Sequence, residues 1–292
     1  MNNRFGFFYF SGTGNTKKSV SLLKEKLEKY GNLIKCYEID ELLKNSENID
    51  FGVFDKILIG YPIYSFNVPK IVYDFVKKLP KVTKKDTIIF ETAGDFISVN
   101  YGACFELKNK LKNKGFIVNY KTIIAMPSNF LIQYPDDFSK QLYEASIKKI
   151  DIIADEIEKG VERKIKFVLW QKFVSLMGKM EQSGATFYGM ALTNTKDCTK
   201  CNLCVSKCPV NNLYFDGDRL KGKSKCIFCM RCAYICPKKA VTSKFMSNVI
   251  LKEGYDIDHI INHIPEKPYV TKETKKGYYK HFYDYIYSDK IY

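Results

Sequence analysis

A cysteine pattern that occurs twice constrains this chain more than any other feature of its sequence. The first copy is Cys198-x2-Cys201-x2-Cys204-x3-Cys208-Pro209, and the second, displaced by 28 residues, is Cys226-x2-Cys229-x2-Cys232-x3-Cys236-Pro237. Three cysteines at successive three-residue spacings curl a tight loop in which three thiolates converge on one cluster. The fourth cysteine lies too far along the chain to close the same site, so it ligates the cluster of the other half.

The repeat therefore predicts two [4Fe–4S] clusters with crossed ligand sets. One set is Cys198, Cys201, Cys204 and Cys236, and the other is Cys226, Cys229, Cys232 and Cys208. Zinc is the alternative, because pairs of cysteines two residues apart also bind zinc. Zinc sites need neither a third cysteine at the same spacing nor a fourth followed by proline, so iron–sulfur ligation is the favoured interpretation.

The start of the sequence indicates the compartment in which these cysteines work. It reads MNNRFGFFYFSGTG, without an apolar stretch of signal length or a cleavage site. No run of about 18 apolar residues occurs, so we expect no transmembrane helix and a cytoplasmic protein. A reducing compartment favours metal ligation over disulfides. The two other cysteines, Cys36 and Cys104, are expected to be buried free thiols.

Strand and helix patterns alternate through the first 160 residues. Short apolar runs predict strands, and helical spacing of apolar residues predicts the helices between them. The predicted strands are residues 4–10, 33–39, 55–60, 87–91 and 117–125, and the predicted helices are residues 16–30, 69–79, 101–113 and 136–160. This alternation predicts an α/β fold, in which right-handed βαβ units build a five-stranded, doubly wound parallel sheet.

A loop of glycine and hydroxyl residues follows the first predicted strand directly and precedes a predicted helix. It comprises Ser11, Gly12, Thr13, Gly14, Asn15 and Thr16. Its glycines allow the backbone N–H groups to point inward, and its hydroxyls and the helix N-terminus add further attraction for an anion. The loop therefore predicts a phosphate site, although it lacks the GxxxxGK[ST] pattern of a P-loop.

This loop resembles the phosphate signature of flavodoxins, a hydroxyl residue followed by x-Thr-Gly-Asn-Thr, at every position. The resemblance spans about 160 residues in element order and implies FMN bound to a flavodoxin-like sheet. It also implies two loops that hold the flavin ring at the carboxyl ends of the third and fourth strands. The first is Pro62, Ile63, Tyr64, Ser65, Phe66 and Asn67, and the second is Thr92, Ala93, Gly94 and Asp95, followed by Tyr101. No catalytic residue is predicted.

The cysteine segment resembles bacterial-type two-cluster ferredoxins at all of its ligand positions, which implies a small α+β domain. Together the two resemblances identify the chain as similar to the flavodoxin–ferredoxin fusion proteins of anaerobes. They imply a flavodoxin-like FMN-binding domain at 1–160, a connecting amphipathic helical segment at 161–196, a two-cluster ferredoxin-like domain at 197–240 and an aromatic-rich tail at 241–292.

The connecting segment and the tail carry weaker signals. A helical stripe is predicted at Ile165, Leu169, Phe173, Met177 and Met180, with Trp170 and Val174 beside it. Docking on the flavodoxin-like domain is the favoured interpretation, and contact with a membrane surface is the alternative. The tail is rich in tyrosine, so we expect it to pack against the body. His259 and His263 lack a third ligand and are expected to be surface or packing residues.

Electron transfer is the predicted function. FMN holds one or two electrons and each cluster passes one, so the chain can relay electrons between them. The alternative is a flavin-dependent reductase of a small molecule. It rests on the long loop at 126–135, which could cap a substrate pocket or dock the ferredoxin-like domain.

The charge of the chain bears on its partners. The 47 basic residues exceed the 32 acidic ones, which gives a formal charge of +15. Such a balance favours acidic partners, and because the lysines are scattered we expect acidic redox partner proteins and no nucleic acid, with contact to a membrane surface disfavoured. No GxGxxG follows a predicted strand, so no nicotinamide site is predicted.

Overall fold

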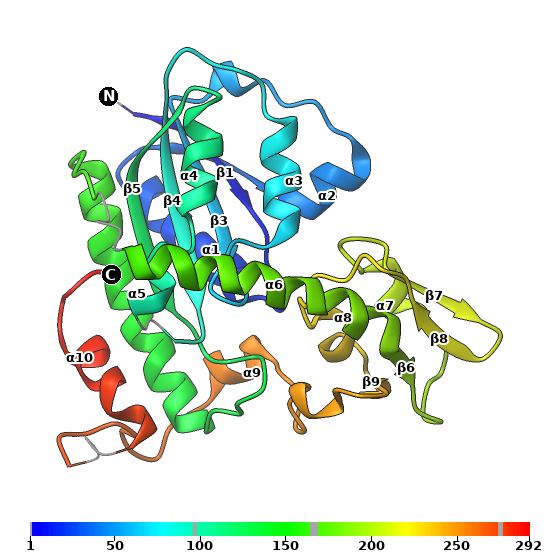
Figure 1. Ribbon diagram of the computed structural model, residues 1–292. Coiled ribbons are helices and arrows are strands. Elements are labelled where there is room, and N and C mark those ends of the chain that lie inside the picture. Colours follow the sequence, from blue (N-terminus) through cyan, green and yellow to red (C-terminus); the bar gives the residue numbers. More distant parts are fainter. Residues whose placement is uncertain (1, 96–97, 164–168, 274–276) are drawn as a thin grey trace.

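A five-stranded parallel sheet organises the first half of the chain (Figure 1). The structure is a computed structural model that describes residues 2–95, 98–163, 169–273 and 277–292. The strand order is β2-β1-β3-β4-β5, with β1 at Arg4–Tyr9, β2 at Leu33–Glu38, β3 at Lys56–Pro62, β4 at Lys85–Ala93 and β5 at Phe116–Ala125. The predicted doubly wound sheet is confirmed, and its order is the one found in flavodoxins.

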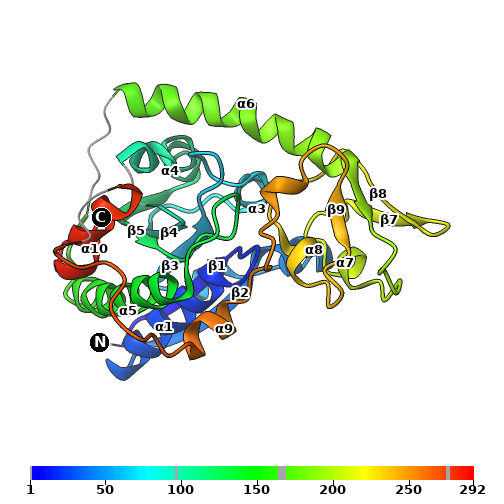
Figure 2. The same ribbon diagram turned by 90° about the horizontal axis from the view of Figure 1, so that it is seen from below.

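Helices cover both faces of this sheet (Figure 2). One face carries α1 at Asn15–Lys29 and α5 at Asp136–Glu158, and the other carries α2 at Ile39–Asn45, α3 at Lys70–Lys78 and α4 at Phe105–Lys112. The predicted helix at 101–113 is shorter than expected, because residues up to Gly102 form the 3-10 turn η2 at Ser98–Gly102.

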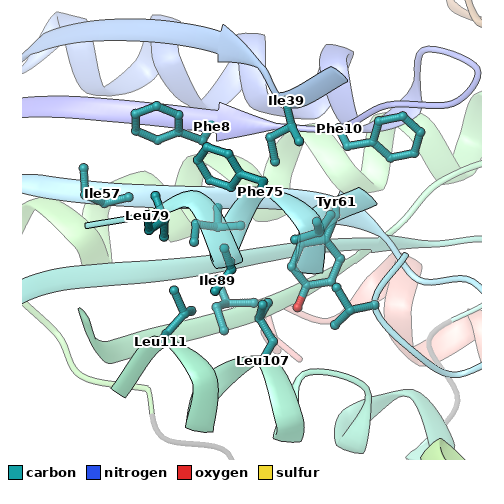
Figure 3. Packing of buried hydrophobic residues seen from close by; sticks show 14 of the residues in the cluster. Phe8, Phe10, Ile39, Ile57, Tyr61, Phe75, Leu79, Ile89, Leu107 and Leu111 are labelled. Atoms are coloured by element: carbon teal, nitrogen blue, oxygen red, sulfur yellow. The ribbon is translucent and has the colours of Figure 1, made fainter. Parts of the chain in front are cut away.

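Side chains that alternate along β1 feed two separate cores. Phe8 and Phe10 point to one face, and Phe5 and Phe7 to the other. Figure 3 shows the first cluster, in which the rings of Phe8 and Phe75 stack with centroids 5.3 Å apart. Burial on both faces explains why these strands read as continuous apolar runs.

A long helix, α6 at Leu169–Ala191, connects the sheet to the cysteine-bearing segment (Figures 1 and 2). The predicted docking on the sheet unit is observed, but the contacting face is small and polar: Gln171, Ser175 and Gly178 are buried on it. Trp170 and Met177, which the predicted stripe placed on or beside the docked face, are 45% and 52% exposed. The other stripe residues Ile165, Leu169, Phe173 and Met180 fall, wholly or in their side chains, outside the described part of the chain.

Close backbone approach explains this difference. A Cβ added to Gly178 would lie 1.8 Å from the carbonyl oxygen of Ser65. The Nδ2 of buried Asn67 donates a hydrogen bond of 2.8 Å to the carbonyl of Ser175. The helix backbone therefore rests directly on the loop after β3, where large apolar side chains would hold it away.

The cysteine-bearing segment forms a small α+β unit, as predicted. It contains two antiparallel pairs, β6 at Leu192–Asn194 with β9 at Val241–Ser243 and β7 at Leu213–Asp216 with β8 at Arg219–Gly222, and two short helices, α7 at Leu203–Ser206 and α8 at Arg231–Tyr234. Its own core includes Leu192, Leu213 and Leu220.

The tail packs against the sheet unit, which confirms the expectation from its aromatic content. It contains α9 at Ile257–Asn262 and α10 at Phe282–Tyr287, and Phe282 and Tyr285 are fully buried beside Phe138 of α5. The carbonyl oxygen of Tyr292 accepts a hydrogen bond of 2.7 Å from the N–H of Ile123. The end of the tail thus pairs with the exposed edge of β5.

The structure confirms some of the expectations for the isolated cysteines and histidines and corrects one of them. Cys104 is buried as predicted, but Cys36 is exposed, because it lies on the edge strand β2, whose side chains are poorly covered. His259 and His263 contact acids at the start of α5, with Nε2 to carboxylate distances of 3.2 Å to Asp136 and 2.7 Å to Asp137. Within the described ranges, no helix has the length and apolar content needed to cross a membrane.

The docking of α6 predicts an unusual response to alanine. We expect Gly178→Ala to lower the free energy of unfolding by about 1–3 kcal/mol, because the new methyl group collides with the carbonyl of Ser65. Gly184 is the matched control in the same helix, because an added Cβ there meets nothing within 4 Å. Gly184→Ala should stabilise the helix by about 0.5–1 kcal/mol. Urea unfolding measures the free energy of unfolding of both variants. Equal changes in the two variants would contradict a close backbone contact at Gly178.

Candidate functional site

A cavity of about 430 Å³ lies at the carboxyl ends of the parallel strands. This is the edge at which doubly wound sheets bind their ligands, and the volume is in the range of small-molecule sites. The cavity is lined by many of the residues that the sequence predicted for flavin binding: Ser11, Gly12, Thr13, Asn15, Thr16, Pro62, Ile63, Tyr64, Ser65, Thr92, Ala93, Gly94 and Asp95. The structure therefore brings together most of the residues predicted for the flavin.

The structure does not place four of the predicted residues at this cavity: Gly14, Phe66, Asn67 and Tyr101. Gly14 has φ +103° and lies against Ile257 of the tail. Asn67 is turned toward α6, where it holds Ser175. The carbonyl of Tyr101 is held by the buried Lys121, on the side of the sheet near β5.

The phosphate loop, residues 11–16, has the chemistry of an anion site. Helix α1 begins after Gly14 with no side chain capping its N-terminus and no acidic residue in its first turn. The N–H groups of a first helical turn have no intrahelical partners, and they attract a phosphate together with the helix dipole. The Thr16 and Thr92 hydroxyls lie 2.7 Å apart and join this loop to the loop after β4.

The loop after β3 makes a tight reversal at the cavity wall. Tyr64 and Asn67 exchange two backbone hydrogen bonds of 3.0 Å, and both residues between them have positive φ, 49° at Ser65 and 57° at Phe66. This is the geometry of a type I′ turn, which non-glycine residues adopt at some cost in strain. Such strain is typical of a loop shaped for a ligand.

The tail reaches the loop after β4. The Nε2 of His281 lies 2.9 Å from both carboxylate oxygens of Asp95. Tyr134 donates from its hydroxyl to the carbonyl of Gly94 at 2.9 Å, and its oxygen lies 3.0 Å from the hydroxyl of Tyr278. The predicted flavin loop is therefore fixed by residues far away in the sequence.

A buried ion pair and a tyrosine lie where β3 and β4 lead into the two predicted flavin loops. Glu91 and Lys121 lie 2.9 Å apart and are almost fully excluded from solvent. Tyr61 donates from its hydroxyl to Glu91 at 2.9 Å. Burial raises the pKa of Glu91 above its usual range, although Lys121 and Tyr61 oppose the shift. Burial alone would lower the pKa of Lys121, but the neighbouring Cys104 and Glu91 raise it.

The two cysteine copies have the same backbone geometry. Positive φ angles recur at positions 28 residues apart: Lys200 and Phe228, Asn202 and Met230, Asn211 and Lys239. Helices α7 and α8 are displaced by the same interval. Each fourth cysteine accepts an N–H to sulfur hydrogen bond, from Asn212 to Cys208 at 3.2 Å and from Ala240 to Cys236 at 3.3 Å. The sequence repeat is thus a structural repeat, and such N–H to sulfur bonds tune iron–sulfur sites.

Burial raises the pKa of some of these cysteines in the absence of metal. It raises the pKa of Cys204 and Cys226 to about 11 and that of Cys229 to about 12. A metal binds the thiolate form, so its positive charge would stabilise the negative thiolate that burial disfavours. Among the described residues, no three or more His, Cys, Asp or Glu side chains gather tightly enough for a single metal ion. In a [4Fe–4S] cluster each thiolate binds a different iron.

The loop at 126–135 lies between the cavity and the cysteine-bearing unit. Its residues Pro127, Ser128, Asn129, Phe130 and Tyr134 line the cavity. The rings of Phe130 and Phe228 meet edge to face with centroids 5.2 Å apart, and the carbonyl of Asn129 accepts a hydrogen bond from Tyr234. The loop therefore docks the ferredoxin-like unit, one of the two roles considered for it.

Four further lining residues were not predicted: Gly184, Phe228, Met246 and Tyr278. Cys229, predicted only as a metal ligand, lines the cavity as well. These residues come from α6, the second cysteine loop and the tail. No local sequence pattern connects such distant segments, although the tyrosine content of the tail indicated that it would pack on the body.

Comparisons with known proteins find matches to two separate parts of the chain. Residues 7–115 match the family model for a flavodoxin domain, and residues 190–237 match the model for a 4Fe-4S dicluster domain. No curated protein sequence matches the chain.

Several solved structures are similar to the chain in part. The rubredoxin:oxygen oxidoreductase of Desulfovibrio gigas is 14% identical over 55% of this chain and 36% of its own, with a TM-score of 0.38. A Streptococcus pneumoniae TIGR4 flavodoxin is 14% identical over 54% of this chain and 99% of its own, and flavodoxin 2 of Bacillus cereus is 17% identical over the same shares, both with a TM-score of 0.38.

A flavodoxin domain and an iron–sulfur domain in one chain define an electron transfer protein. The domains are those of a flavodoxin–ferredoxin fusion, and the electrons pass between flavin and iron–sulfur.

The buried pair Glu91–Lys121 generates a prediction with a defined dependence on pH. We expect Lys121→Met to lower the free energy of unfolding at pH 7 by about 3–5 kcal/mol, because it leaves a buried carboxylate unpaired. The double variant Glu91→Gln/Lys121→Met should recover much of this loss. Without Lys121 the folded-state pKa of Glu91 rises further, so the deficit should shrink as the pH falls toward 5. Urea unfolding at several pH values measures this loss of unfolding free energy. A loss that does not depend on pH would refute the conclusion that Lys121 stabilises an ionised Glu91.

Proposed function

We propose that the chain relays single electrons between two [4Fe–4S] clusters and an FMN, and that an external redox protein supplies or accepts them. The observation that carries the proposal is the shared wall of the cavity. Predicted flavin residues such as Gly12 and Tyr64 line it together with Cys229, a predicted cluster ligand. The clusters would be held by the crossed ligand sets, Cys198, Cys201, Cys204 and Cys236 in one, and Cys226, Cys229, Cys232 and Cys208 in the other.

The residues of the cavity suit FMN in two respects. The uncapped start of α1 and the hydroxyl of Thr13 offer donors to the phosphate. The walls Pro62–Ser65 and Thr92–Asp95, with Tyr278 of the tail, offer an apolar slot with polar rims for the ring. FMN supplies a carrier that takes up one or two electrons, whereas each cluster exchanges one.

A reductase remains the second candidate. Residues 127–130 and Tyr278 line the cavity together with the residues of the sheet unit, and a small substrate would need such additional walls. The same loop packs against Phe228 and Tyr234, so the docking of the ferredoxin-like unit already accounts for its position. The relay therefore explains the loop without a substrate.

The partner of the relay is proposed from charge and chemistry. A chain with a formal charge of +15 attracts an acidic redox protein, while scattered lysines give no continuous track for nucleic acid. We propose that the protein functions in the cytoplasm of an anaerobic cell, since thiolate-bound clusters need a reducing environment.

The first experiment is anaerobic purification followed by assay of iron, sulfide and flavin. We expect about eight iron atoms, about eight sulfides and one FMN per chain, as two [4Fe–4S] clusters and one flavin require. Addition of a one-electron reductant should bleach the cluster and flavin absorbance together. Iron without flavin would refute the FMN assignment, four iron atoms would refute the second cluster, and zinc would refute the relay.

The phosphate site can be tested by ligand discrimination. We expect Thr13→Val, which keeps the side-chain shape, to raise the FMN dissociation constant by about tenfold, the equivalent of one charge-assisted hydrogen bond. Binding of riboflavin, which lacks the phosphate, should hardly change. Fluorescence titration measures both ligands, and an equal loss for both would contradict a phosphate contact at Thr13.

A further inference from the structure

Arg231 joins the second cysteine copy to the phosphate loop. It lies between Cys229 and Cys232, at the start of α8, and its side chain extends into the flavodoxin-like unit. Its Nη2 donates to the carbonyl of Ser11 at 2.7 Å, its Nε to the carbonyl of Gly12 at 3.2 Å, and its Nη1 to the carboxylate of Asp40 at 2.5 Å. One side chain thus ties a cluster loop to the backbone of the predicted FMN loop.

This contact is buried and specific. The side chain of Arg231 is 14% exposed and that of Asp40 is 0% exposed. Within the part of the chain that the structure describes, the second carboxylate oxygen of Asp40 has no hydrogen-bond partner, so its charge depends on Arg231. The guanidinium also lies 5.7 Å from the centroid of the Phe10 ring. Its planar fork of donors is what such a multiple contact requires.

The backbone of the second cysteine loop also touches the phosphate loop. A Cβ added to Gly12 would lie 2.4 Å from the carbonyl oxygen of Cys229 and 2.5 Å from the hydroxyl of Tyr64. Cys229 and Ile227 belong to the apolar cluster of the sheet unit, while Met230 and Phe228 of the same loop pack in the core of the small unit. The second loop is therefore part of the wall of the flavin cavity.

Among the described residues, the equivalent positions of the first copy do not make these contacts, although the carbonyl of Lys207 accepts a hydrogen bond of 3.2 Å from Arg231 and Val210 packs against the apolar cluster of the sheet unit. Leu203 occupies the position that Arg231 has in the repeat, and it is 36% exposed. Cys201, the counterpart of buried Cys229, is exposed. In both views α8 lies nearer to the sheet than α7 does (Figures 1 and 2). The equivalent positions of the repeat thus differ in their surroundings: Arg231 and Cys229 are buried at the junction, whereas Leu203 and Cys201 are not.

We propose that the second copy is the flavin-side half of the relay, with Arg231 as its positioning residue, and that the first copy meets the external partner. The proposal rests on the proposed function and adds to it the order in which the electrons pass. A one-electron donor protein is oxidised at the exposed first copy, and each electron crosses to the second copy and then to the flavin site. Two such electrons, with two protons from solvent, complete the reduction of one flavin.

The test compares three variants of the anaerobically purified full chain. Arg231→Gln removes the contact, and Arg231→Gln/Asp40→Asn replaces the ion pair by two neutral amides, so that no buried charge remains if the single variant folds poorly. Leu203→Gln is the matched control at the equivalent position of the first copy. Iron and FMN contents are measured first, and rapid mixing with a one-electron donor protein then separates cluster reduction from flavin reduction by wavelength.

We expect both Arg231 variants to keep their iron and to show unchanged cluster reduction, while flavin reduction slows by about tenfold or more, because small displacements of reacting groups cost rate steeply. Leu203→Gln should leave the transfer from the clusters to the flavin unchanged, and any effect it has should fall on cluster reduction, because the first copy meets the donor protein. Normal cofactor contents with an unchanged flavin rate in the double variant would overturn the inference but leave the relay standing. A wild-type chain without iron or FMN would instead overturn the proposed function. An equal slowing of both steps would show a structural effect and would also overturn the positioning role.

Discussion

The contact between the Arg231 guanidinium and the carbonyls of Ser11 and Gly12 is the interaction on which the arrangement of the two units depends. A loop that turns its N–H groups toward a phosphate turns carbonyl groups away from it, and buried carbonyls need donors. Here the donors come from the cysteine-bearing unit. Asp40 holds the guanidinium in place from the second helix of the sheet unit. The carbonyl side of the predicted phosphate loop is thus completed by the loop that carries the second set of predicted cluster ligands.

Glycine makes the remaining junctions possible. Gly12 admits the carbonyl of Cys229, and Gly178 admits the carbonyl of Ser65. At the far end of α6, a Cβ on Gly222 would lie 1.7 Å from the carbonyl oxygen of Gly189. The helix α6 therefore rests on the sheet unit and on the cysteine unit by direct backbone contact. Such contacts are short-ranged and intolerant of added volume, so they define a single relative position better than a layer of flexible apolar side chains would.

Local patterns in the sequence predicted the parallel sheet of flavodoxin type and the cysteine repeat, because each depends on spacing within a short segment. The phosphate loop at 11–16 was predictable for the same reason, since a strand, the loop and a helix follow directly. Contacts over long distances were not predictable: Arg231 reads as an ordinary surface charge, and Tyr278 as one of many tail tyrosines. The predicted stripe of α6 failed at Met177, since the helix docks through small residues, and Cys36 is exposed on an edge strand.

Four segments distant in sequence complete the cavity over the flavodoxin-like sheet: the loop after β5, helix α6, the second cysteine loop and the tail. Their contacts couple processes that would be separate in two independent proteins. Ligation of iron–sulfur by the buried cysteines would contribute free energy to the folding of the cysteine unit, and the folded cysteine unit supplies Cys229 and Phe228 to the cavity. Any ligand of that cavity in turn stabilises the docked arrangement by mass action. Cofactor loading of one site therefore favours loading of the other, and a chain with both cofactors is also the one in which the two sites are held against each other.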